Sequence, residues 1–203
     1  MKKFASVVLF FGVLLLLLSG CSNAMDTPTS KVEEFLGKYQ RMDDDVVSQL
    51  DQVLKDDDSM NDDQKEEYRS ILEKQYQNLS YKIENEEING DNATVDVEIE
   101  VLDYATTIAK AKEYYEEHKD EIEKENQEEQ SDNDNVVEDA TEGVEEAVEE
   151  SAAYIDYKLK ELKSASDTTT YNITFYLTKE DGEWQLQDLS DLDLQKIHGL
   201  YEG

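Results

Sequence analysis

Cysteine, proline and histidine are scarce in this sequence of 203 residues, which has one cysteine, one proline and two histidines. One cysteine forms no intrachain disulfide, so the folded part must be held by its apolar core. His118, His198 and the cysteine give no metal-ligand spacing, and the chain has neither a glycine-rich phosphate loop nor a G-x-S-x-G nucleophile elbow. We therefore predict no metal, no cofactor and no catalytic residues.

Basic residues are also scarce, with 19 lysines and arginines against 51 aspartates and glutamates. The formal net charge of −32 would repel nucleic acid and anionic lipid headgroups. We therefore exclude nucleic acid as a partner and expect a charged partner to be a basic protein or a cationic ligand. The sequence leaves the oligomeric state open.

The only long apolar run lies at the N-terminus. Lys2 and Lys3 precede the apolar residues 7–18, and small residues follow them. This order of charged, apolar and small residues is that of a secretory signal peptide. The run is shorter than the ~20 residues that a membrane-spanning helix needs, so we expect removal after export.

Cys21 comes directly after Leu18, Ser19 and Gly20, and these four residues resemble the lipobox of bacterial lipoproteins. The resemblance implies that signal peptidase II recognises Leu18, Ser19 and Gly20 and cleaves before Cys21, whose thiol carries a diacylglyceryl group. Residues 1–20 are then a lipoprotein signal peptide, and acyl chains hold the protein on the extracytoplasmic face of the cell membrane. The alternative is an ordinary signal peptide with an incidental cysteine.

Residues 21–30 are predicted to be the lipidated N-terminus and a polar linker, which contains the single proline, Pro28. At ~3.3 Å per residue the linker reaches at most about 30 Å. A single α+β domain is expected over 31–203, close to the bilayer. It includes a helical insertion over 105–165.

The first helical pattern of the domain runs from about 31 to 55. Ser30 and Glu33 match a capping box, and apolar residues then recur at three- and four-residue steps. The acidic residues 56–58 oppose the negative end of the helix dipole and predict its end. Their spacing does not match a Ca²⁺-binding loop, so a solvated loop is favoured over a cation site. A second helix is predicted from Asn61, antiparallel to the first.

Two β-hairpins are predicted from alternating apolar and polar residues. The first turns at Asn89-Gly90-Asp91, and the second turns at Glu180-Asp181-Gly182 and returns through Trp184, whose ring we expect in the core. A short helix over about 189–200 should fold back on the sheet. The expected inward positions are all apolar: Ile83, Val95, Val97, Ile99, Ile173, Phe175 and Leu177.

Between the hairpins, residues 105–165 return to a helical period and predict an acidic helical hairpin. Its two runs are separated by the polar residues 126–135, and residues 113–150 carry 18 acidic side chains and two lysines. The apolar seam is short and rich in alanine, which favours weak packing over a long coiled coil. A charged outer face is usually only solvated. The alternative is a partner surface, with these candidates: Glu145, Glu146, Glu149 and Glu150.

The two hairpins carry a resemblance to a known fold. The segments 81–103, with Asn89-Gly90 at the turn, and 177–186, with Asp181-Gly182 at the turn, are similar to those of small Gram-positive cell-envelope lipoproteins with a cystatin-like, NTF2-like domain. The resemblance implies paired N-terminal helices on a curved antiparallel sheet. It covers about 112 residues, outside the acidic insertion.

Two classes of function remain. One is a non-catalytic binding or accessory module at the cell envelope, and the other is an NTF2-like enzyme that uses the concave face of the sheet. His118 lies in an acidic run, where an exposed helix position is expected. His198, beside Gly199, is expected to interact with the C-terminal end of a helix dipole. The apolar inward strand positions favour the non-catalytic module.

Overall fold

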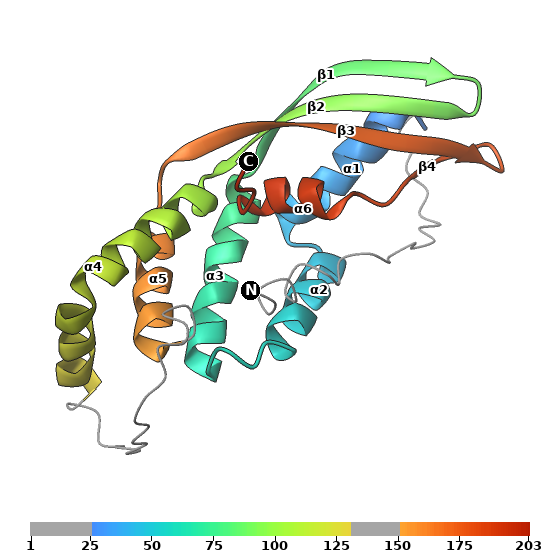
Figure 1. The fold of residues 1–203 in the computed structure, drawn as a ribbon. Coiled ribbons are helices and arrows are strands. Elements are labelled where there is room, and N and C mark those ends of the chain that lie inside the picture. Colours follow the sequence, from blue (N-terminus) through green and yellow to red (C-terminus); the bar gives the residue numbers. More distant parts are fainter. Residues whose placement is uncertain (1–25, 131–150) are drawn as a thin grey trace.

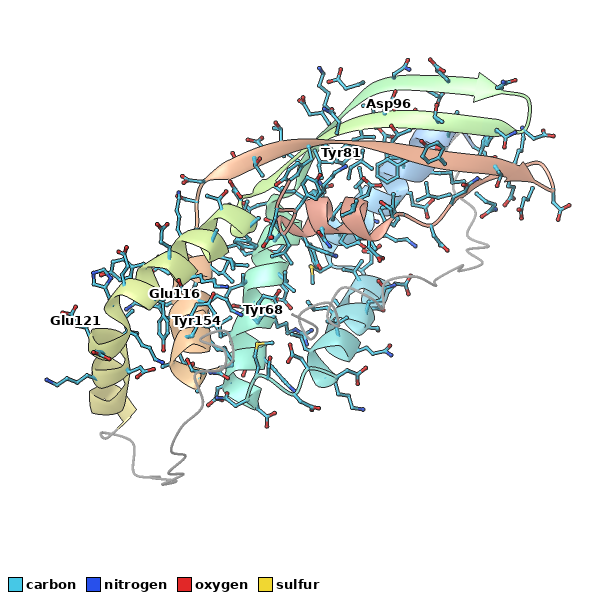
Figure 2. All side chains as sticks on the ribbon, viewed as in Figure 1. Tyr68, Tyr81, Asp96, Glu116, Glu121 and Tyr154 are labelled. Carbon is cyan, nitrogen blue, oxygen red and sulfur yellow. The ribbon has the colours of Figure 1, made fainter. Side chains whose placement is uncertain are left out.

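The computed structural model of the protein describes residues 26–130 and 151–203. Over these ranges it is an α+β fold, as the sequence predicts, with six helices and a four-stranded antiparallel sheet in the order β1-β2-β3-β4. The helices lie on one side of the sheet (Figure 1). The opposite face is polar, and Figure 2 shows Asp96 on it.

The region predicted as one helix over 31–55 is two helices, α1 (Pro28–Arg41) and α2 (Asp44–Lys55). Met42 between them is left-handed, with φ 54° and ψ 51°, and its N–H donates to the Tyr39 carbonyl oxygen at 3.0 Å. Asp43 then starts α2. The apolar spacing continues across this break, so the pattern did not reveal it.

The start of α1 also differs from the prediction. The capping box joins Thr27 and Ser30 rather than Ser30 and Glu33: the Thr27 hydroxyl accepts from the Ser30 N–H, and the Ser30 hydroxyl accepts from the Thr27 N–H, both at 3.1 Å. Pro28 fits the first turn, where no N–H donor is needed. The last three residues of the predicted linker therefore belong to α1.

The second predicted helix is confirmed as α3 (Asp62–Asn78), with its start at Asn61. The Asn61 side chain accepts from the Gln64 N–H at 2.9 Å, and the Gln64 side chain accepts from the Asn61 N–H at 3.0 Å. The predicted end of the preceding helix is also confirmed, because α2 stops at Lys55.

Both predicted hairpins are confirmed, as β1 (Ser80–Asn89) with β2 (Asn92–Leu102) and β3 (Thr168–Glu180) with β4 (Glu183–Leu186). The second turn has positive φ at both central residues, 52° at Asp181 and 92° at Gly182, which suits the twist of a tight hairpin. Trp184 is buried, as expected. The expected inward positions are also buried, except Ile83, which is only partly buried.

β1 is a ten-residue strand at the edge of the sheet, paired only with β2. Its register shifts between Ile83 and Asn85, which marks a bulge. Beyond the bulge, Glu86 reaches α1, where one carboxylate oxygen accepts from the Thr29 N–H at 3.0 Å and the Thr29 hydroxyl at 2.7 Å. Helix α1 is thereby tied to the edge strand.

The predicted insertion contains α4 (Tyr104–Gln130) and α5 (Ala152–Ser164). α4 continues to Gln130, into the stretch predicted as a polar separator, while residues 137–150 of the second predicted run lie outside the described residues. The pair is held by more than its chain connections to the sheet, because α5 packs against α3. Their shared buried cluster consists of Ile71, Leu102, Tyr104, Ile155, Leu159 and Leu162.

The predicted terminal helix is confirmed as α6 (Asp191–His198), which Ser190 caps at its start and Gly199 at its end. Its residues Leu194 and Ile197 are buried, and Ile197 belongs to the core cluster under the sheet. α6 and α1 therefore cover part of the inner face of the sheet (Figure 1).

Candidate functional site

The inner face of the sheet, where the enzyme hypothesis places its site, is filled by apolar side chains. Val95, Ile99 and Phe175 are fully buried there. The Phe35 ring packs edge-on against the Phe175 ring, with centroids 5.9 Å apart. The strand positions of this face are apolar, and the polar side chains that reach the same core cluster in the described structure include Tyr39 and Tyr76.

Two open surface depressions lie elsewhere, and a basic side chain in each is held by contacts within the fold. In the first, between α2 and α3, Arg69 forms ion pairs with Asp51 and Glu73. In the second, beside the start of β1, the Lys74 ammonium donates to the carbonyl oxygens of Lys163 and Ala165, at 3.1 and 2.9 Å. These contacts join α3 to the end of α5.

His198 lies in a buried aromatic cluster with Tyr39 and Tyr76. α1, α3 and α6 each supply one of these side chains. The Tyr76 hydroxyl and His198 Nδ1 are 3.0 Å apart, and the Tyr39 ring packs edge-on against Tyr76 with centroids at 5.1 Å. The cluster therefore joins three helices that are far apart in the sequence.

Burial controls the ionisation of this cluster. It lowers the pKa of His198 to about 4 and raises the pKa values of Tyr39 and Tyr76 well above their usual value of 10, since a charged form would lose its hydration. At neutral pH all three groups are uncharged. The expected charge–dipole role of His198 is therefore wrong, although the residue does end α6.

Gln75 is another buried polar side chain that fixes a junction. Its amide accepts from the Leu102 N–H at 2.9 Å and donates to the Leu102 carbonyl oxygen at 3.2 Å. Gly199 lies against this pair with φ 71°, and a Cβ there would collide with the Leu102 carbonyl oxygen and the Gln75 amide. No local feature of the sequence around Gln75 indicates this contact.

His118 lies at a kink of α4 rather than at a regular helix position. Its backbone, with φ −122° and ψ 20°, is not helical, and its ring is half-buried. Nδ1 lies 3.0 Å from the Tyr114 carbonyl oxygen, and the ring stacks on Tyr114 with centroids 4.0 Å apart. His118 and His198 lie on different elements and share no site.

The acidic residues make no metal site within the described ranges. No group of three or more histidine, cysteine, aspartate or glutamate side chains there could hold an ion. In the acidic loop after α2, the Asp57 carboxylate accepts from the N–H and the hydroxyl of Ser59, at 2.8 and 2.6 Å. This geometry fits the solvated loop that we expected at 56–58.

The other predicted site residues lie outside the described residues. These are the lipobox residues Leu18, Ser19, Gly20 and Cys21, and the candidate partner surface Glu145, Glu146, Glu149 and Glu150. Among the helices of the described part, none is both long and apolar enough to span a bilayer. No protein-family model, curated protein or solved structure matches the chain.

Proposed function

We propose that this protein is a lipid-anchored lipoprotein on the extracytoplasmic face of the cell membrane, where it acts as a non-catalytic binding or accessory module. The observation that carries the proposal is the signal-peptide order that ends in Leu18, Ser19, Gly20 and Cys21. Two acyl chains on Cys21 are sufficient for stable anchoring without a protein span.

Packing and ionisation support a binding module rather than an NTF2-like enzyme. The inner sheet face is occupied by core side chains such as Phe175, and burial holds His198 neutral. We also propose that α1 on the sheet corresponds to the cystatin-like, NTF2-like arrangement, with its usual cavity filled.

The charge of the chain supports a basic protein or a cationic ligand as partner. Lys2 and Lys3 are the only charged residues before Cys21, so removal of 1–20 leaves 17 basic and 51 acidic side chains, a formal −34. Such a field speeds the approach of an oppositely charged partner more than it tightens the final complex.

Intact mass of the membrane-extracted protein tests the anchor. We expect the loss of residues 1–20 and a diacylglyceryl adduct on Cys21. The matched control is Cys21→Ser, which keeps the signal run but has no thiol to modify, and it should show no adduct. A mature, soluble form with a free Cys21 thiol would contradict the proposal.

Complementation of a deletion phenotype separates the module from the enzyme. His118→Ala and His198→Ala should both restore the phenotype if they fold and are lipidated, because neither histidine does chemistry. Neutralising Glu145, Glu146, Glu149 and Glu150 to glutamine should instead slow partner association and make it less sensitive to salt. Loss of complementation by a folded, lipidated histidine variant would favour the enzyme.

A further inference from the structure

Asp26 fixes the place where the chain enters the folded domain. One of its carboxylate oxygens accepts from the Trp184 N–H at 3.1 Å, and the other lies 3.5 Å from the Lys31 ammonium. Trp184 is the second residue of β4, directly after the turn at Asp181. The first described residue is therefore held at the turn end of the sheet.

The other hairpin turn lies at the same end. The Lys179 N–H, on β3, donates to the carbonyl oxygen of Asp91 at 2.8 Å, so the β1–β2 and β3–β4 turns are neighbours. Glu86, close to the first of these turns, holds Thr29 at the start of α1. The start of α1 and both turns thus gather at one end of the molecule (Figure 1).

The α4–α5 pair lies at the opposite end. Leu102, which precedes α4, pairs with Thr168, the first residue of β3. The 13 residues of β3 separate this point from the β3–β4 turn, which is roughly 40 Å at ~3.3 Å per residue. From there α4 continues away from the sheet (Figure 1), and at ~1.5 Å per residue its 27 residues are about 40 Å long.

We infer that the turn end of the sheet lies next to the membrane and that the α4–α5 pair is the surface farthest from the bilayer. In this orientation the α4–α5 pair is accessible to a basic partner. The inference rests on the proposed anchor at Cys21. The five residue steps from Cys21 to Asp26 reach at most about 18 Å at ~3.6 Å per residue, much less than the length of the sheet. The tether therefore holds one end only.

Charge keeps the free end away from the bilayer. α4 carries a row of exposed carboxylates, and Figure 2 shows Glu116 and Glu121 on it. An anionic bilayer repels these groups within a Debye length of about 8–10 Å. Because the tether restrains only the turn end, this repulsion turns α4 outward, where its carboxylates meet a basic partner first. The exposed carboxylates are those of Glu113, Glu116, Glu117, Asp120 and Glu121.

Energy transfer to the bilayer tests this orientation on the full, lipidated chain. Cys21 is the only natural cysteine and is acylated in the proposed form, so Asp91→Cys and Lys124→Cys each add one reactive thiol. Both positions are exposed. A donor dye on each is measured against headgroup acceptors in phosphatidylglycerol–phosphatidylcholine vesicles. We expect transfer from position 124 to be at least about fivefold weaker, since roughly 30 Å of helix, at ~1.5 Å per residue, lies between the sheet and position 124 in addition to the length of the sheet.

Two controls test whether the difference in energy transfer comes from the orientation of the protein. Glu87→Cys and Glu121→Cys, also exposed, repeat the comparison at a second pair of positions in case one label disturbs the fold. A 20-residue Gly/Ser insertion between Ala24 and Met25 adds roughly 25 Å of flexible tether. It should weaken transfer from position 91 and reduce the difference between the two ends.

The outcomes distinguish the orientation from the anchor. Equal transfer from both ends, or stronger transfer from position 124, in protein that floats with the vesicles would overturn the orientation and leave the anchor in place. Protein that does not float with the vesicles would overturn the anchor and the orientation together.

Discussion

The core beneath the sheet and the outer part of the α4–α5 pair are held in different ways. The first is a cluster of 19 buried apolar residues drawn from α1, α2, α3, α6 and the sheet, whereas the second has three buried residues, Tyr115, Ile122 and Tyr154. Tyr154 packs edge-on against Tyr115, whose hydroxyl donates to Glu123 at 3.0 Å. This difference indicates that the core under the sheet contributes most to the free energy of unfolding. The outer part of the α4–α5 pair should open locally at a lower free-energy cost.

A matched pair of substitutions measures this difference directly. Ile173→Ala removes the same atoms as Ile122→Ala, but Ile173 lies in the large cluster with 2% of its surface exposed, and Ile122 lies in the small one with 9% exposed. We expect Ile173→Ala to cost about 4 kcal/mol, because a close-packed site cannot collapse around the cavity, and Ile122→Ala about 1–2 kcal/mol.

Urea unfolding monitored by circular dichroism gives both free energies. Equal losses from the two substitutions would mean that the outer part of the pair is as rigidly packed as the core under the sheet. Ile83→Ala, at a partly buried strand position, should fall between them.

The two histidines differ in burial, and this difference predicts how the free energy of unfolding changes at acid pH. Unfolded His198 binds a proton below pH ~6.5, but the folded state binds it only near its pKa of about 4. The unfolded state therefore carries more protons between these values, and stability should fall as pH is lowered through this window. At ~1.4 kcal/mol per pH unit, the loss approaches about 3 kcal/mol.

Stability measured from pH 7 to pH 4 checks the sign. His198→Gln should flatten this part of the profile, because it removes the group that must be kept neutral in the core. The matched control is His118→Gln, which replaces a half-buried histidine on α4 outside that core. The same slope in all three proteins would refute the role of His198.

The smallest expected effect concerns salt. At a formal net charge of −32, self-repulsion opposes compaction, and salt screens it over about 10 Å at 0.1 M. Moderate NaCl should raise Tm by roughly 2–4 °C, equivalent to about 1 kcal/mol in a domain of this size. Hydrogen exchange should slow more in α4 than in β2, because five exposed carboxylates lie along the described part of α4 and only two, those of Glu98 and Glu100, lie on β2.

Calcium separates screening from binding. At matched ionic strength CaCl₂ should add little to the effect of NaCl, because the described residues include no group that could hold an ion. A saturable rise in Tm at micromolar Ca²⁺ would contradict this expectation.

The sequence predicted those parts of the fold that depend on neighbouring residues. Both hairpins followed from alternation around Asn89-Gly90 and Asp181-Gly182, and the start of α3 followed from Asn61. The break at Met42 was missed, because one left-handed residue leaves the apolar spacing on either side intact.

Contacts between distant segments could not be predicted in this way. Tyr76 and His198 are 122 residues apart, and nothing local to either indicates their hydrogen bond. The same holds for Gln75 and Leu102, which are 27 residues apart and joined by two hydrogen bonds. The anchor at Cys21 is a purely local signal and stays a prediction.

The edge strand β1 has a consequence for how the protein behaves at high concentration. A ten-residue edge offers unpaired backbone groups on which a strand of another copy could add, the first step of sheet aggregation. Here the bulge after Ile83 interrupts the edge, and Glu84, Glu86 and Glu87 line it with carboxylates. A second copy would bring the same charges opposite them. The edge thus discourages self-association even where many copies are crowded together.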